Sequence, residues 1–188
     1  MRKSILPSIV AGVTMLSALV GIGAGQVAGA TEHPGGDDLE VRWTLIANAD
    51  DGRSHLARWA ITNRGDVALP ARGWTIYFNM LHMASLEPIF EIPPTVTITH
   101  FSGDLFKLQP TDAFSPLAPG KTFTFEYRGV EPINKPSWGP QGPYIVFEND
   151  NGGEEPPEII GKVTIDPFSR PEQINRGSDD QTPVPTPA

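Results

Sequence analysis

The 188-residue chain contains no cysteine. This absence excludes disulfide bonds, zinc sites built on thiolates and a cysteine nucleophile, so a folded domain must be held together by its core alone. Positive charge is also scarce, with 14 Lys and Arg against 22 Asp and Glu and a formal net charge of −8. An acidic surface repels phosphate backbones, and nucleic acid is therefore not expected as a partner.

Complete catalytic motifs are missing as well. The sequence has no G-x-S-x-G motif and no glycine-rich phosphate-binding loop. Its adjacent acidic pairs lie in expected turns or in the C-terminal tail, whereas catalytic carboxylates need a shaped, partly dry pocket. The four histidines, His33, His55, His82 and His100, show no ligand spacing and are expected at the surface or the edge of the core. We therefore predict no catalytic residue, no metal site and no cofactor.

One loop has a weak resemblance to a calcium site. The segment 148–152, Glu-Asn-Asp-Asn-Gly, offers oxygen ligands at close spacing. It lacks the alternation and the trailing bidentate Glu of an EF-hand, so calcium remains a minor alternative.

The first 30 residues have the composition of an export signal. Arg2 and Lys3 precede an almost uncharged run that closes on Ala28-Gly29-Ala30, as a signal peptidase site requires. The run is long enough to cross a bilayer, so a retained anchor is the alternative, but its glycines favour cleavage. We expect residues 1–30 to be a signal peptide and the mature protein to be periplasmic or secreted, without a stable membrane span.

The mature chain alternates apolar and polar residues over short segments bounded by turn residues. This period-two pattern predicts strands with one face on a core, at 39–45, 55–62, 74–80, 96–100, 122–127, 144–148 and 159–165. The turn Asn151-Gly152-Gly153 predicts a hairpin connection between the last two. Only 81–91 has helical character, which its prolines limit to a turn or two. The pattern predicts an all-β, two-sheet sandwich over residues 38–166.

The segments that flank this domain have linker composition. Residues 31–37 form a short, flexible lead-in, and residues 167–188 form a tail with five prolines and scarcely an apolar side chain. Such a tail is expected to be extended and unable to bury itself. A linker of this kind suggests that another domain normally follows.

The aromatic residues are the best candidates for ligand binding, because sugar rings lay their apolar faces on aromatic side chains. Trp43, Trp59 and Trp74 lie on the apolar faces of strands and are expected in the core. Tyr77 has the opposite phase and should face outward. Trp138 lies in a loop rich in Pro and Gly, where it either closes the end of the sandwich or is presented to a ligand.

Several stretches in this order resemble a known family, the N-terminal carbohydrate-binding domain of bacterial β-N-acetylhexosaminidases (chitobiases) of glycoside hydrolase family 20. The stretches are 60–66, 73–79, 100–110, 114–120, 126–127, 142–147 and 170–173. The most specific is Gly103-Asp104-Leu105-Phe106-Lys107-Leu108. The resemblance implies an immunoglobulin-like sandwich similar to cellulose-binding modules. In the full enzymes an α+β domain and a catalytic barrel with an Asp-Glu pair follow, whereas this chain contains no Asp-Glu dipeptide.

The resemblance implies a non-catalytic module that binds chitin-like glycans containing N-acetylglucosamine, with a catalytic hexosaminidase domain as a partner. The candidate ligand-binding residues are Trp138, Tyr77 and Tyr144; the loop 136–143 departs from the family's pattern, so the role of Trp138 is inferred from its loop and not from the resemblance. Two alternatives stay open: an architectural domain that binds no sugar, and a truncated gene product. Exposure of Tyr77 and Trp138 on one surface would favour binding.

Overall fold

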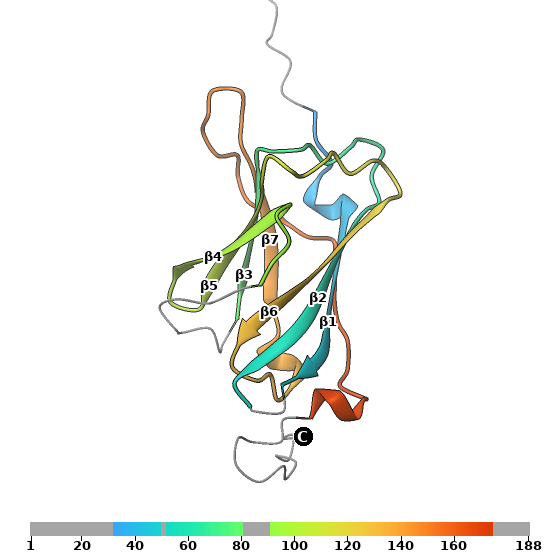
Figure 1. Ribbon diagram of the computed structural model, residues 1–188. Coiled ribbons are helices and arrows are strands. Elements are labelled where there is room, and N and C mark those ends of the chain that lie inside the picture. Colours follow the sequence, from blue (N-terminus) through green and yellow to red (C-terminus); the bar gives the residue numbers. More distant parts are fainter. Residues whose placement is uncertain (1–31, 50–51, 81–90, 175–188) are drawn as a thin grey trace, which may run out of the picture.

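The computed structural model describes residues 32–49, 52–80 and 91–174, and these form a sandwich of two β-sheets (Figure 1). The strands are β1 (Leu39–Asn48), β2 (Ser54–Asn63), β3 (Trp74–Asn79), β4 (Val96–Ser102), β5 (Leu105–Pro110), β6 (Thr122–Val130), β7 (Gln141–Phe147), β8 (Glu158–Ile159) and β9 (Lys162–Ile165). One sheet has the strand order β6-β2-β1-β9, and the other has the order β4-β5-β3-β7-β8. The predicted all-β, immunoglobulin-like sandwich is confirmed.

Alternation of apolar and polar side chains places the core between the sheets. Leu39, Val41, Trp43 and Leu45 of β1 are buried, and the residues between them are more exposed. The ring of Trp59 on β2 lies 5.1 Å, centroid to centroid, from that of Phe78 on β3, which joins the two sheets. The three tryptophans predicted in the core, Trp43, Trp59 and Trp74, are all at most 2% exposed.

A strand that the sequence analysis did not predict lies beside β3. β5 pairs with β3 on one side and with β4 on the other, so it completes the centre of the five-stranded sheet. Its inward residues Phe106 and Leu108 are buried and alternate with Lys107 and Gln109. The pattern is short because the turn at Gly103 and the residue Pro110 bound it closely.

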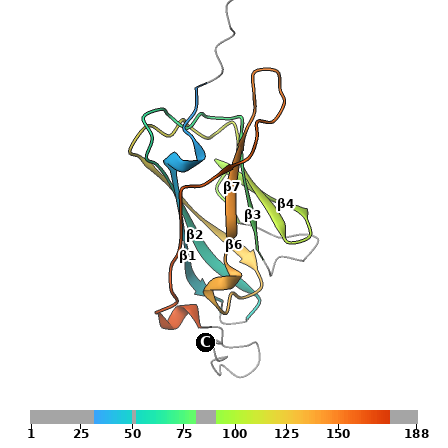
Figure 2. The same ribbon diagram turned by 180° about the vertical axis from the view of Figure 1, so that it is seen from behind.

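The single strand predicted over 159–165 is wrong: the segment forms two strands in different sheets (Figure 2). β8 follows the predicted turn and pairs antiparallel with β7, whereas β9 pairs in parallel with β1. The crossing occurs at Gly161, whose amide donates to the carbonyl oxygen of Gly36 over 3.0 Å. A Cβ at Gly161 would lie 2.3 Å from the carbonyl oxygen of Asp37, so only glycine allows this approach.

Both flanking segments pack on the sandwich further than their composition predicted. In the lead-in, the His33 ring stacks on Phe147 at 3.6 Å, and a 3-10 turn, η1 (Gly36–Asp38), precedes β1. After β9, a second 3-10 turn, η3 (Pro171–Gln173), packs on β1, and Gln173 is only 3% exposed. The packed unit therefore extends at least from residue 33 to residue 173.

Several predictions fall outside the described residues. These are the signal peptide at 1–30, most of the helical turn at 81–91 with His82, and the tail from 175 onward. In the part of the chain that the structure describes, no helix has the length and apolar character needed to cross a membrane.

Candidate functional site

Three aromatic side chains form an exposed cluster on the outer face of the five-stranded sheet. Tyr77 and Tyr144 are cross-strand partners on β3 and β7, and their rings stack at 5.2 Å with an angle of 13° between the planes. Phe101 on β4 is 56% exposed and meets Tyr77 edge to face at 5.7 Å. We call Tyr77, Phe101 and Tyr144 the aromatic platform. Tyr77 thus faces outward, as its phase predicted.

The chain after β7 borders the platform on one side. A shallow groove is lined by the platform and by four further residues, Val146, Glu154, Glu155 and Pro157. A second hollow, lined by Gly142, Pro143, Tyr144, Pro157 and Ile159, shares two of its residues with this groove. Ile159 is 78% exposed. The outer face therefore offers a continuous open surface of aromatic and aliphatic groups, with carboxylates at one edge.

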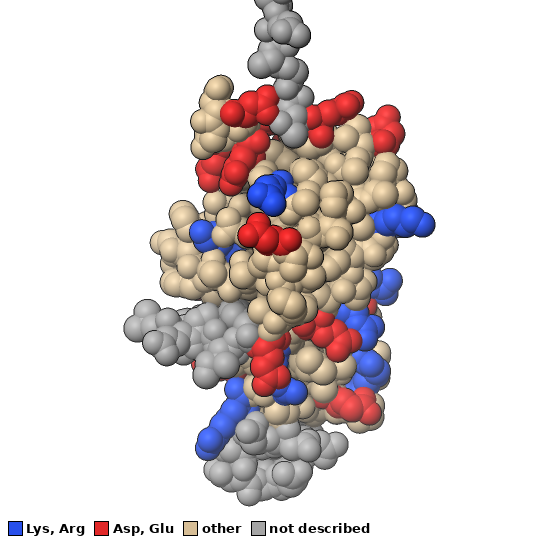
Figure 3. All heavy atoms as spheres, turned by 45° about the horizontal axis from the view of Figure 1, so that its top comes forward, with Lys and Arg blue, Asp and Glu red and all other residues tan. Residues whose placement is uncertain are grey.

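Charged side chains are distributed unevenly around the platform. Glu154 lies beside Tyr77. The pKa of the Tyr77 phenol is raised above its usual value, first by partial burial of the ring and second by the negative charge of Glu154. The Oε2 atom of Glu155 lies 3.2 Å from Nε2 of His33. Lys107 on β5 is the cross-strand partner of Tyr77 on the side away from Tyr144. Acidic side chains also surround the end of the sandwich where the lead-in begins (Figure 3).

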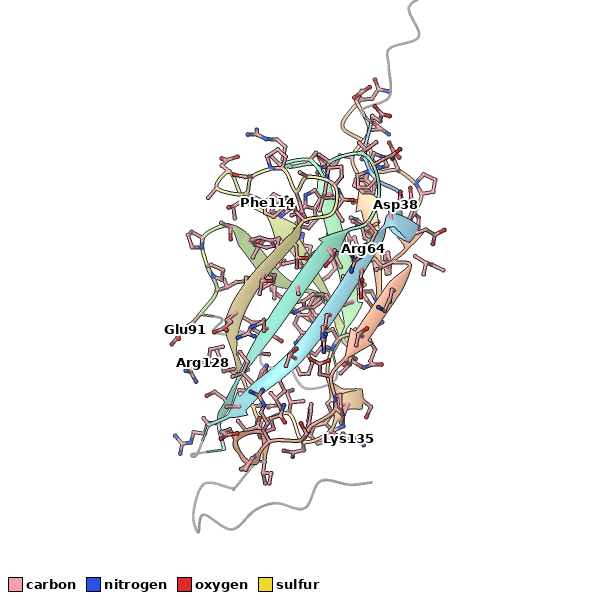
Figure 4. All side chains as sticks on the ribbon, turned by 90° about the vertical axis from the view of Figure 1, so that its right-hand side faces the viewer. Asp38, Arg64, Glu91, Phe114, Arg128 and Lys135 are labelled. Carbon is pink, nitrogen blue, oxygen red and sulfur yellow. The ribbon has the colours of Figure 1, made fainter. Side chains whose placement is uncertain are left out.

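The structure does not add Trp138 to this cluster. Trp138 ends a 3-10 turn, η2 (Pro136–Trp138), in the connection between β6 and β7, and it is half-buried against the core. The Nζ atom of Lys135 lies 5.3 Å from the centre of its ring. Figure 4 places Lys135 at the end of the sandwich opposite Asp38. Two of the three predicted binding residues, Tyr77 and Tyr144, therefore lie together. The third, Trp138, lies apart from them at one end of the sandwich.

The outer face of the other sheet has a different chemistry (Figure 4). Its charged groups are paired across strands: Arg42 lies 2.8 Å from Asp166, and Arg58 lies 2.6 Å from Glu126. Hydrogen bonds from Arg42 and Thr44 lower the pKa of Asp166 despite the opposing effect of its partial burial. A groove between this sheet and the segment 166–173 has no aromatic side chain among its lining residues. This face therefore provides no platform for a sugar ring.

The histidines that the structure describes, His33, His55 and His100, do not belong to a metal site. In the described ranges, no group of three His, Cys, Asp or Glu side chains is close enough to hold an ion. His100 is exposed, with Nε2 2.8 Å from the carbonyl oxygen of Gly103. His55 differs from its predicted position at the core edge, because it is fully buried. In the loop considered for calcium, residues 148–152, Oδ1 of Asn149 accepts hydrogen bonds from the amides of Asn151 and Gly153. Such bonds from a side chain to the following main chain are typical of an Asn-containing turn.

Comparison of the sequence with protein families gives a match over residues 30–134 to the family described as "Putative carbohydrate binding domain". The match covers more than half of the chain. The chain belongs to this carbohydrate-binding domain family. The family predicted from the sequence motifs is confirmed. A separate comparison with curated proteins gave no match.

Solved structures with a similar fold include glycosidases and binding modules. An exo-β-N-acetylglucosaminidase of family GH20 from Vibrio harveyi is 17% identical, with a TM-score of 0.48, over 71% of this chain and 19% of that one. The CBM3b module of the scaffoldin ScaA from Acetivibrio cellulolyticus is 14% identical, with a TM-score of 0.42, over 65% of this chain and 99% of that one. The chitin-binding domain of Chi18aC from Streptomyces coelicolor is 20% identical, with a TM-score of 0.35, over 56% of this chain and 90% of that one. The chain thus spans about a fifth of the Vibrio enzyme.

The family match includes part of the platform only. Tyr77 and Phe101 lie within residues 30–134 of this carbohydrate-binding domain, whereas Tyr144 lies beyond them. Phe101 and Glu154 were not predicted as site residues. Phe101 could have been found, because it follows the buried residues Val96 and Ile98 of β4 at the outward phase. Glu154 could not, since its place beside Tyr77 depends on the path of the loop after β7.

Proposed function

We propose that this chain is a non-catalytic carbohydrate-binding module that holds glycans containing N-acetylglucosamine on the aromatic platform. The observation that carries the proposal is the stacked, outward-facing pair Tyr77 and Tyr144. Pyranose rings have apolar C–H faces that pack on aromatic rings, and neighbouring polar groups bind their hydroxyls. Glu154 and Glu155 provide such acceptors at the edge of the groove.

Membership of a carbohydrate-binding domain family supports the class of ligand. The choice of N-acetylglucosamine rests on the sequence resemblance to the N-terminal domain of bacterial β-N-acetylhexosaminidases. On that resemblance, the module would target a catalytic hexosaminidase domain to chitin-like material. An architectural role would instead favour an apolar patch near the C-terminal segment. The groove there has a mixed lining of charged residues (Arg42, Arg58, Asp166) and aliphatic residues (Ile46, Ala60, Pro167).

The cellular setting is part of the same proposal. Residues 1–30 would be removed during export, which leaves the sandwich and its tail in the periplasm or outside the cell. Residues 38–166 would be the binding domain, and the residues after η3 would connect it to a following domain.

Binding to insoluble chitin tests the platform. The chain lacking residues 1–30 should be retained on chitin at micromolar concentration, and Tyr144→Ala should weaken its affinity roughly tenfold, because a central aromatic contact typically contributes more than about 1 kcal/mol. Trp138→Ala removes an aromatic side chain outside the platform and should leave retention unchanged. Failure of the unaltered chain to bind at this concentration would refute the proposed function.

Turnover tests the non-catalytic part of the proposal. The same protein should release no chromophore from a chromogenic N-acetylglucosaminide above the rate of a buffer control. Activity that survives purification and co-elutes with the chain would show that its carboxylates do catalyse hydrolysis.

A further inference from the structure

The groove beside the platform is lined by two carboxylates and no cationic side chain. Glu154 and Glu155 are both lining residues, together with the three aromatics, Val146 and Pro157. These carboxylates can accept hydrogen bonds from the hydroxyls of a neutral sugar, and their negative charge attracts a cationic sugar in addition.

Backbone hydrogen bonds hold these carboxylates in place. The main chain of Glu154 forms an antiparallel β-bridge with that of Glu148 across the turn after β7. The amide of Glu155 donates to the carbonyl oxygen of Phe147 over 2.7 Å. The main chain at both residues is therefore hydrogen-bonded to the end of β7 and the residue after it. This pairing sets where the two residues lie relative to Tyr144 on β7. Glu154 is exposed, and the side chain of Glu155 is 28% exposed, so a ligand can reach both.

The nearby basic side chains lie outside the groove. Lys107 is on β5, on the far side of Tyr77 from Tyr144, and His33 lies behind Glu155 in the lead-in, stacked on Phe147. Neither residue lines the groove. A glycan on the platform therefore meets negative charge at the end near Pro157 and positive charge at the end near β5.

We propose that the platform prefers glycans that carry free amino groups, such as partially deacetylated chitin, and that it places an ammonium group beside Glu154 and Glu155. This inference rests on the proposed function, because the same platform would bind the sugar rings. An ammonium group near two carboxylates gains Coulomb energy that an acetamide group does not. The net charge of −8 acts in the same direction.

Salt distinguishes this charge effect from ordinary hydrogen bonds between carboxylates and sugar hydroxyls. Attraction between exposed charges is screened as ionic strength rises, whereas stacking and neutral hydrogen bonds are affected much less. Exposed ion pairs are individually weak, so two carboxylates should give a preference of roughly threefold to tenfold at low salt.

The experiment compares two soluble oligomers of equal length, one fully acetylated and one partially deacetylated. Affinities for the chain lacking residues 1–30 are measured at about pH 5.5, where the sugar amines are protonated, in low and in high salt. The deacetylated oligomer should bind roughly threefold to tenfold more tightly at low salt, and the two affinities should converge at high salt.

Three variants locate the effect. The double variant Glu154→Gln, Glu155→Gln should lose the preference and still bind the acetylated oligomer. Glu126→Gln removes one negative charge from the outer face of the other sheet and should keep the preference. Tyr144→Ala should lose affinity for both oligomers.

The outcomes separate this inference from the proposed function. If neither oligomer binds, the proposed function fails. Equal binding of both oligomers leaves the module intact and overturns the preference for amines. A preference that persists in the double carboxylate variant would also overturn it, because the attraction would then be a property of the whole surface.

Discussion

At the scale of single residues, His55 shows how closely the core is packed. It is fully buried, its Nδ1 atom lies 2.7 Å from the carbonyl oxygen of Glu131, and its ring meets Tyr127 edge to face. Its cross-strand partner is Gly129, where a Cβ would lie 2.3 Å from the imidazole. Burial lowers the pKa of His55 to about 4, since a protonated ring would be charged inside the core.

This burial predicts a pH-dependent stability. In the unfolded chain His55 has an ordinary pKa of about 6.5, so between about pH 6.5 and pH 4 the unfolded state binds the extra proton. The free energy of unfolding should therefore be greatest above about pH 6.5 and should fall by about 3 kcal/mol as the pH decreases to about 4. Urea denaturation at a series of pH values measures this dependence.

His55→Gln provides the comparison, because it removes the titrating ring and keeps a side-chain donor. The difference in slope between the two proteins over this pH range isolates His55 from the other acidic and basic groups. Identical slopes would contradict the assignment. An NMR titration of the His55 ring gives an independent check should the variant fold poorly.

At the scale of elements, side-chain hydrogen bonds tie η3 to β1, and Gln173 takes part in several of them. The amide nitrogen of the Gln173 side chain donates to the carbonyl oxygen of Leu45, next to the irregularity between Leu45 and Ala47 in β1. Its oxygen accepts from the amides of Ser169 and Arg170 at 2.7 and 2.8 Å. The main-chain oxygen of Gln173 accepts from the side chain of Asn48. A segment with linker composition is thereby fixed to the sheet.

Gln173→Ala should destabilise the protein by about 1 to 2 kcal/mol, because the amides of Ser169 and Arg170 lose their acceptor and the carbonyl oxygen of Leu45 loses one of its two side-chain donors. Glu172→Ala is the matched control: Glu172 is the exposed neighbour in the same turn, and its replacement should change the free energy of unfolding by less than about 0.5 kcal/mol. Chemical denaturation of both variants measures the difference. Equal stabilities would show that η3 contributes nothing to the fold.

The same element marks a limit of prediction from sequence. Alternation correctly predicted most strands, because the pleat forces side chains to opposite faces and one face is buried. The docking of Gln173 could not be predicted, since it depends on which carbonyl groups of a distant strand lack partners. The division of 159–165 into β8 and β9 also depends on tertiary contacts, namely the close approach of Gly161 to Asp37.

At the scale of the whole molecule, the candidate site depends on strand order. The outward phase of Tyr77 was predictable from β3 alone, but its stacking on Tyr144 requires that β7 lie beside β3 in one particular register. Trp138 drew attention through its Pro- and Gly-rich loop, yet the structure packs it against the core. Local pattern therefore predicts which side chains face outward, and only the fold decides which of them meet.

The parallel pairing of β1 with β9 has a mechanical consequence. The lead-in joins β1 at one end of the sandwich, and the segment that continues from β9 leaves at the other end, as Figure 1 shows. Tension between these two points would pull β1 and β9 in opposite directions along their length. The hydrogen bonds of this ladder, with the ion pair of Lys162 and Glu40, would then share the load and rupture together rather than one after another. Force applied between the two ends of the sandwich would therefore meet strong resistance along this ladder.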